Sequence, residues 1–230
     1  MASATGDPEQ VRARSEEQPL LGRPGDVTQQ PGQALFANLL TGTAILAQAG
    51  IWILTSLVWS AVFEANFIFF SYHPILQSAG ILLLTQSILV LQPTATPKQK
   101  RDGTWVHAAF NTLGFGALIA GMVVIEMNKA SHPETRFTST HGIVGLVTFV
   151  LIILQVLVGV VQYWLPGLVG GVDNVSGYAI LLLSLASIIT STSTNFNVNV
   201  LHIRLWAVIV ASVLVLAGVV PRIKKRKFGF

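Results

Sequence analysis

Six stretches of nearly uninterrupted apolar sequence constrain this chain more than any other feature. The hydrocarbon core of a bilayer is about 30 Å thick, and a helix needs around 20 apolar residues to cross it. Only 10% of the 230 residues are charged, whereas soluble domains carry roughly 25%. We therefore predict an all-α membrane protein with six transmembrane helices, at Asn38–Phe63, His73–Leu91, Trp105–Ile125, His141–Trp164, Ser176–Thr194 and Leu201–Val220.

Basic residues are distributed unevenly, and this predicts how the chain is oriented. With six spans, the two ends and the loops after the second and fourth spans lie on one side of the membrane. That side carries eleven Lys and Arg residues, and the opposite side carries only Lys129, Arg136 and Arg204. The positive-inside rule then places both termini in the cytosol. The net charge of +4 follows from this topology and does not indicate nucleic-acid binding.

The two ends of the chain differ in composition from the apolar region at 38–220. Residues 1–37 are rich in Gly, Pro, Gln and charge, which is typical of a disordered tail. Within it, Glu16–Leu21 resembles an acidic dileucine sorting signal and favours an endolysosomal or vacuolar membrane, with a plain solvated tail as the alternative. Residues 221–230 form a basic cytosolic tail, expected to lie against anionic lipid headgroups.

Three histidines stand at or near the starts of predicted spans. Because helices alternate in direction, His73 and His141 fall on the outer face and His107 on the cytosolic face. An ionisable residue at membrane depth usually has a functional role, and the chain has no cysteine that could bind a metal. In a four-helix core made by spans two to five, spans two and four lie diagonally, so His73 and His141 can provide both axial ligands of one haem iron. For each residue alone, an interfacial histidine bonded to backbone or headgroup is the alternative.

The fourth histidine of such an arrangement is missing. His107 needs a partner at the start of the fifth span, around Asp173 to Ser176, and no histidine occurs there. His132 falls in the predicted outer loop, and His202 begins the sixth span, also on the outer side. We assign no haem role to Asp173 or its neighbour Asn174. His107 alone predicts a five-coordinate or unoccupied site.

These histidine motifs resemble those of the cytochrome b561 family. Ser-Tyr-His-Pro at His73, Trp-Val-His-Ala-Ala-Phe-Asn at His107 and Ser-Thr-His-Gly-Ile-Val-Gly at His141 match its ligand motifs over about residues 38–220. The resemblance implies six spans and two b-type haems held by four histidines. Ser176–Tyr178 matches the second half of the fifth-span motif, without its histidine. Two explanations stay open: a deletion in the gene model before this point, or a chain that keeps one complete haem site.

The resemblance implies a function as well as a fold. It implies a transmembrane oxidoreductase or ferric reductase that takes electrons from cytosolic ascorbate through haem b to monodehydroascorbate or ferric iron. A homodimer is suggested by the resemblance alone. Two other classes stay open: a non-catalytic scaffold with at most one haem, and a solute channel or transporter, although intramembrane acidic residues typical of transporters are absent.

Cationic side chains near the histidines are candidate contacts for these anionic substrates. Anchoring to the membrane surface under the positive-inside rule is the alternative for the cytosolic ones, and an exposed solvated loop charge is the alternative for the outer one. The candidates are Lys98, Lys100 and Arg101 in the predicted cytosolic loop and Arg136 in the predicted outer loop before His141.

Overall fold

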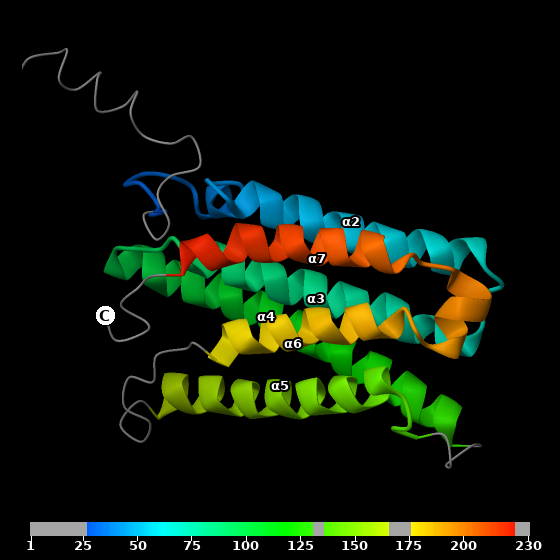
Figure 1. Ribbon diagram of the computed structural model, residues 1–230. Coiled ribbons are helices and arrows are strands. Elements are labelled where there is room, and N and C mark those ends of the chain that lie inside the picture. Colours follow the sequence, from blue (N-terminus) through cyan, green and yellow to red (C-terminus); the bar gives the residue numbers. More distant parts are fainter. Residues whose placement is uncertain (1–26, 131–135, 166–175, 224–230) are drawn as a thin grey trace, which may run out of the picture.

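The computed structural model describes residues 27–130, 136–165 and 176–223, and in these ranges it contains helices and no strands. The predicted all-α membrane fold is confirmed. Four short helical segments, η1 (Leu35–Leu39), η2 (Phe69–Ser71), the π-helical η4 (Asn197–Leu201) and η5 (Val220–Arg222), flank the long helices. The long helices lie side by side in one bundle (Figure 1): α2 (Ala44–Glu64), α3 (Tyr72–Leu91), α4 (Pro97–Lys129), α5 (Thr140–Trp164), α6 (Ser176–Ser191) and α7 (Leu205–Val219).

Five helical segments of the described chain are long and apolar enough to cross a bilayer. The sixth, α6, is apolar but has 16 residues, which corresponds to about 24 Å of helix. The predicted count of six spans is therefore supported at five positions. Arg222 after α7 contacts Thr41 before α2, so both ends of the bundle region lie on the same side, as an even number of spans requires. The five segments are Ala44–Glu64, Phe69–Leu91, Pro97–Lys129, Thr140–Tyr163 and Leu205–Arg222.

Helix α4 begins eight residues before the predicted third span, which corrects the prediction of a loop through Thr104. The Thr96 hydroxyl accepts a hydrogen bond from the Gln99 backbone N–H at 3.2 Å, and the Gln99 side chain accepts one from the Thr96 N–H at 3.1 Å. This capping box starts the helix. Pro97 occupies the first helical position, where its missing N–H costs nothing. The proline therefore starts a helix here instead of breaking one.

The first and last spans also begin later than predicted. Helix α2 starts at Ala44 because residues 35–39 form the separate segment η1. Helix α7 starts at Leu205, after His202 has adopted a left-handed backbone with φ of 53°. The buried side chain of Asn197 accepts from the Ile203 N–H at 3.1 Å and donates to the Ile203 carbonyl oxygen at 3.0 Å. These bonds hold a turn that the apolar sequence alone did not reveal.

The long helices pack in pairs, with α3 against α4, α2 against α7, and α5 against α6, while α2 also contacts α3. Gly50 allows α2 to approach α7 closely, because a Cβ atom at this position would lie 2.5 Å from the Ala211 carbonyl oxygen. Ile51, Leu54 and Val215 are fully buried beside this contact. The pairs α3–α4 and α5–α6 therefore stand next to a tightly packed α2–α7 pair (Figure 1).

Arg222 is a buried cation that ties three segments together. Its side chain is 2% exposed. The guanidinium donates to the carbonyl oxygens of Thr41 at 2.9 Å, Asn38 at 3.1 Å and Leu89 at 3.3 Å. Because these acceptors belong to η1, the turn before α2 and the end of α3, one side chain connects both ends of the bundle region.

Replacing this cation tests that connection. We expect Arg222→Met to lower the free energy of unfolding by about 2–4 kcal/mol, because buried carbonyls that lose their donors cost roughly 1–3 kcal/mol each. Thermal unfolding in detergent, followed by circular dichroism, measures this. Arg101→Met is the matched control, since that side chain is 71% exposed. Equal melting temperatures for Arg222→Met and the unaltered protein would contradict the role assigned to Arg222.

Candidate functional site

His73 and His141 are brought together from two different helix pairs. His73 lies in the first turn of α3 and His141 in the first turn of α5. Their ring centres are 6.3 Å apart and the ring planes are inclined by 79°. A metal ion held between two imidazoles by bonds of about 2.0–2.1 Å puts the ring centres roughly 6 Å apart. The separation therefore fits two axial ligands on opposite sides of one iron.

A backbone carbonyl of the neighbouring helix fixes each of these rings. The Nδ1 atom of His73 lies 2.8 Å from the Gly121 carbonyl oxygen on α4, and the Nδ1 atom of His141 lies 2.9 Å from the Ser187 carbonyl oxygen on α6. A carbonyl oxygen only accepts, so Nδ1 carries the proton and Nε2 keeps a free lone pair. Metal-binding histidines characteristically donate their other ring N–H in this way. Both rings are thus oriented as Nε2 ligands.

A cavity of about 780 Å³ surrounds the two histidines between α3, α4, α5 and α6. Apolar side chains such as Leu118 and Ile152 line its wall, and Phe70 stacks on His73 with ring centres 5.5 Å apart. This volume lies within the range of about 300–1,000 Å³ that is usual for sites holding a small molecule. The cavity can therefore accommodate a flat cofactor between the two imidazoles.

Two histidines suit iron in a porphyrin better than a bare metal ion. Among the described residues, no group of three or more histidine, aspartate and glutamate side chains could hold a metal ion. Haem iron needs only axial ligands from the protein, because the macrocycle supplies the others. The cavity and its two Nε2 atoms fit that group.

His107 lies apart from this cavity, and both of its ring nitrogens have hydrogen-bond partners. Its Nδ1 atom lies 2.9 Å from the Ser87 carbonyl oxygen, and its Nε2 atom accepts a hydrogen bond from the Asn111 side chain at 2.8 Å. Ser87 is fourteen residues along α3 from His73, a rise of about 21 Å. The ring is anchored like the other two, but its second nitrogen is engaged by Asn111.

The predicted partner region of His107 lies partly beyond the described residues. Asp173 and Asn174 fall in the segment 166–175, which the structure does not describe, and Ser176 is the first residue of α6. His132 also falls outside the described ranges, in 131–135. The arrangement of a second site therefore stays a prediction from the sequence.

Of the four cationic side chains predicted to contact substrate, only Arg136 lines the cavity. It forms an ion pair with Glu126 at 3.5 Å. Glu126 was missed by the sequence analysis, which ended the third span one residue earlier. The sequence feature that could have identified Glu126 is an acidic residue at the end of a predicted span, followed by a loop that contains an arginine.

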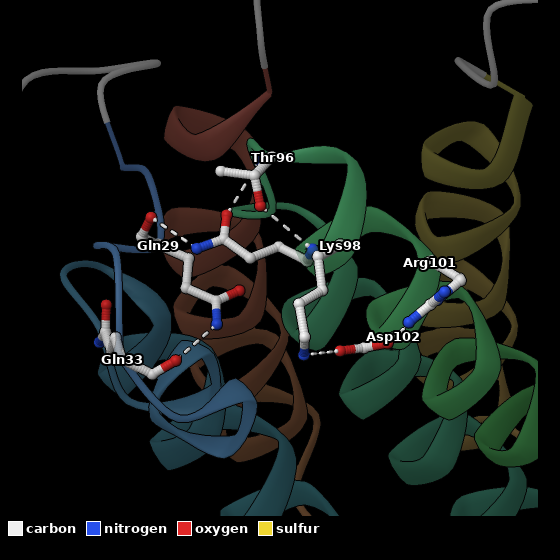
Figure 2. A network of polar contacts seen from close by, with 7 residues as sticks. Gln29, Gln33, Thr96, Lys98, Arg101 and Asp102 are labelled. Atoms are coloured by element: carbon white, nitrogen blue, oxygen red, sulfur yellow. Dashed lines mark hydrogen bonds and ion pairs between the residues drawn. The ribbon is translucent and has the colours of Figure 1, made fainter.

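The other three candidate cations, Lys98, Lys100 and Arg101, lie in the first turns of α4, at the other end of the bundle from His73 and His141. Asp102 contacts Lys98 at 2.7 Å and Arg101 at 3.5 Å, as Figure 2 shows, while Lys100 is exposed. The Gln99 side chain also donates to the Gln29 carbonyl oxygen at 3.3 Å, so the segment before η1 lies against this helix start. Asp102 therefore offsets part of the positive charge there.

Comparison with known proteins identifies a family. A family model described as eukaryotic cytochrome b561 matches residues 72–196. A Sus scrofa protein named transmembrane ascorbate-dependent reductase CYB561 is 24% identical, over 60% of this chain and 53% of its own length. A Homo sapiens protein named lysosomal membrane ascorbate-dependent ferrireductase CYB561A3 is 25% identical, over 60% of this chain and 63% of its own length. The chain thus spans between half and two thirds of these relatives. No solved structure matches it.

The close packing behind the His73 anchor can be tested at Gly121. A Cβ atom at this position would lie 2.8 Å from the Gln77 amide nitrogen, which donates to the Leu118 carbonyl oxygen. We expect Gly121→Ala to push the Gln77 side chain, which lines the cavity, out of its place and so to weaken haem retention. Haem content after gel filtration measures this.

Gly116→Ala is the matched control on the same helix. A Cβ atom at Gly116 would meet nothing within 4 Å. Haem content should therefore equal that of the unaltered protein. An equal loss in both variants would mean that the effect is general to α4 and does not arise from the Gln77 contact.

Proposed function

The chain belongs to the eukaryotic cytochrome b561 family, and on this basis we propose that it is a membrane oxidoreductase that transfers single electrons through b-type haem. The observation that supports this most directly is the His73–His141 pair, with ring centres 6.3 Å apart and both Nδ1 atoms bonded to backbone carbonyls. We propose that these two residues would hold the haem iron through their Nε2 atoms.

The proposed reaction moves one electron from cytosolic ascorbate to an acceptor on the other side of the membrane. Ascorbate loses one electron and one proton and becomes monodehydroascorbate. The acceptor is either monodehydroascorbate, which gains one electron and one proton, or ferric iron, which gains one electron and becomes ferrous. The names of the relatives, ascorbate-dependent reductases and in one case a ferrireductase, support this substrate class. When bound, haem supplies a centre that alternates between ferric and ferrous iron.

The residues of the chain have three tasks in this proposal. His73 and His141 hold the cofactor, and apolar side chains such as Leu118 keep water away from it. Arg136, at the cavity, attracts an anionic acceptor, and Glu126 holds its guanidinium in position. Lys98, Lys100 and Arg101 attract the ascorbate anion at the cytosolic side.

The proposal also includes an orientation and a location. Both termini are cytosolic, with 38–220 as the membrane domain between the N-terminal segment 1–37 and the basic segment 221–230. Gln29 from the first segment and Arg222 from the second pack against the membrane domain. The dileucine-like segment Glu16–Leu21 and the lysosomal name of one relative support an endolysosomal membrane. A homodimer is part of the proposal on family grounds alone.

A second candidate is a member of the family that holds a single haem and has lost cytosolic electron uptake. The observation that favours it is the hydrogen bond from Asn111 to His107 Nε2, which engages the nitrogen a haem would need. The sequence also lacks a histidine at the start of α6. In this case the chain would be a scaffold or a partial relay.

Counting haem distinguishes the two candidates. We expect His73→Leu and His141→Leu to abolish the reduced-minus-oxidised absorbance of the outer haem, because each removes one axial ligand. His107→Leu serves as the control and should leave that absorbance unchanged. Two haems per purified chain would support electron transfer through two haems, one near each face of the membrane, and rule out the one-haem candidate. One haem per chain would support the one-haem candidate. Absence of haem from the unaltered protein would refute both.

The role proposed for Arg136 predicts a change in substrate affinity. We expect Arg136→Gln to raise the KM for an anionic ferric chelate about fivefold, since an exposed charge contact contributes up to about 1 kcal/mol, and the effect should shrink at high salt. Initial rates in ascorbate-loaded vesicles measure this. Arg204→Gln is the matched control, because Arg204 is exposed and does not line the cavity. A KM equally raised in both variants would indicate general surface attraction.

A further inference from the structure

Two side chains share the carbonyl oxygen that anchors His141. The His141 Nδ1 atom lies 2.9 Å from the Ser187 carbonyl oxygen, and the Thr190 hydroxyl donates to the same oxygen at 2.9 Å. The Thr190 hydroxyl also lies 3.0 Å from the Ala186 carbonyl oxygen. Thr190 is half-buried on α6, nearly one turn after Ser187, and is not among the residues that line the cavity.

Sharing weakens the carbonyl as an acceptor for the histidine. A carbonyl oxygen has two lone pairs, and a donor on one of them withdraws electron density from the other. The strength of the Nδ1–H···O bond in turn sets how basic the Nε2 atom is toward a metal. When Nε2 becomes less basic, ferric iron loses more stabilisation than ferrous iron does. This raises the reduction potential.

We propose that Thr190 raises the reduction potential of the haem held by His141, by competing for the Ser187 carbonyl oxygen. This inference rests on the proposed function, since it requires haem at the His73–His141 pair. Thr190 does not line the cavity and acts through the Ser187 carbonyl oxygen that it shares with His141. It is therefore a positioning residue and not a catalytic one.

The other ligand has a different environment. His73 bonds to the Gly121 carbonyl oxygen, and the nearby Gln77 amide donates to the Leu118 carbonyl oxygen instead. The hydroxyl on α6 therefore acts on one side of the iron only. Changing Thr190 should alter the electronic character of the His141 bond and leave the His73 anchor in place.

Replacement of the hydroxyl by a methyl group tests the inference. We expect Thr190→Val to lower the midpoint potential. The ferrous-to-ferric ratio at the wild-type midpoint should fall about threefold, or roughly 28 mV, since tenfold corresponds to 59 mV for one electron. Thr190→Ser keeps the hydroxyl and should keep the potential. Spectroelectrochemistry on the full-length purified protein measures all variants, and Thr190→Ala repeats the test if the valine variant does not fold.

Thr55→Val is the matched control. Thr55 is buried on α2, does not line the cavity, and donates to the Ile51 carbonyl oxygen at 2.8 Å, an acceptor that holds no histidine. The midpoint potential of this variant should stay at the wild-type value. A potential in Thr190→Val or Thr190→Ala that equals that of Thr55→Val, or that rises, would overturn the inference while leaving the haem assignment intact. Failure of the unaltered protein to bind haem would instead overturn the proposed function.

Discussion

The hydrogen bond from a histidine Nδ1 atom to a carbonyl oxygen on the adjacent helix is the interaction on which the site depends. His73, His107 and His141 all make it, to Gly121, Ser87 and Ser187 respectively. Each bond joins the two members of a helix pair and fixes the tautomer with the proton on Nδ1. In His73 and His141 this leaves Nε2 as the nitrogen that can bind a metal, whereas in His107 the Nε2 atom accepts from Asn111. Pairing of α3 with α4 and of α5 with α6 therefore also orients the ligands.

The lipid environment explains why several other buried polar groups are also bonded inside the protein. Without water in the bilayer core, each buried polar group needs a partner inside the protein. The Gln48 and Gln86 amides bond to each other across α2 and α3, at 2.6 and 3.1 Å. Arg222 takes three carbonyl oxygens at one end of the bundle.

The sequence predicted the first ligand pair because alternating helix direction is sufficient to place His73 and His141 at one face. It could not predict the acceptors, since the carbonyls of Gly121 and Ser187 belong to the backbone and leave no side-chain signature. The start of α4 was missed because proline is common both in loops and in the first turn of helices. Here only the Thr96–Gln99 capping box shows that Pro97 begins a helix. Asn111 is part of the sequence motif around His107, but its contact with the His107 ring follows from the four-residue spacing on a helix and was not predicted.

The spacing of these bonds predicts where in the sequence a fourth histidine anchored in the same way would occur. In the α3–α4 pair, the His73–Gly121 and His107–Ser87 bonds are fourteen residues apart on each helix. The same offset from the His141–Ser187 bond leads to Gln155 on α5 and to position 173, an aspartate outside the described residues. An ionised carboxylate only accepts and cannot donate to the Gln155 carbonyl.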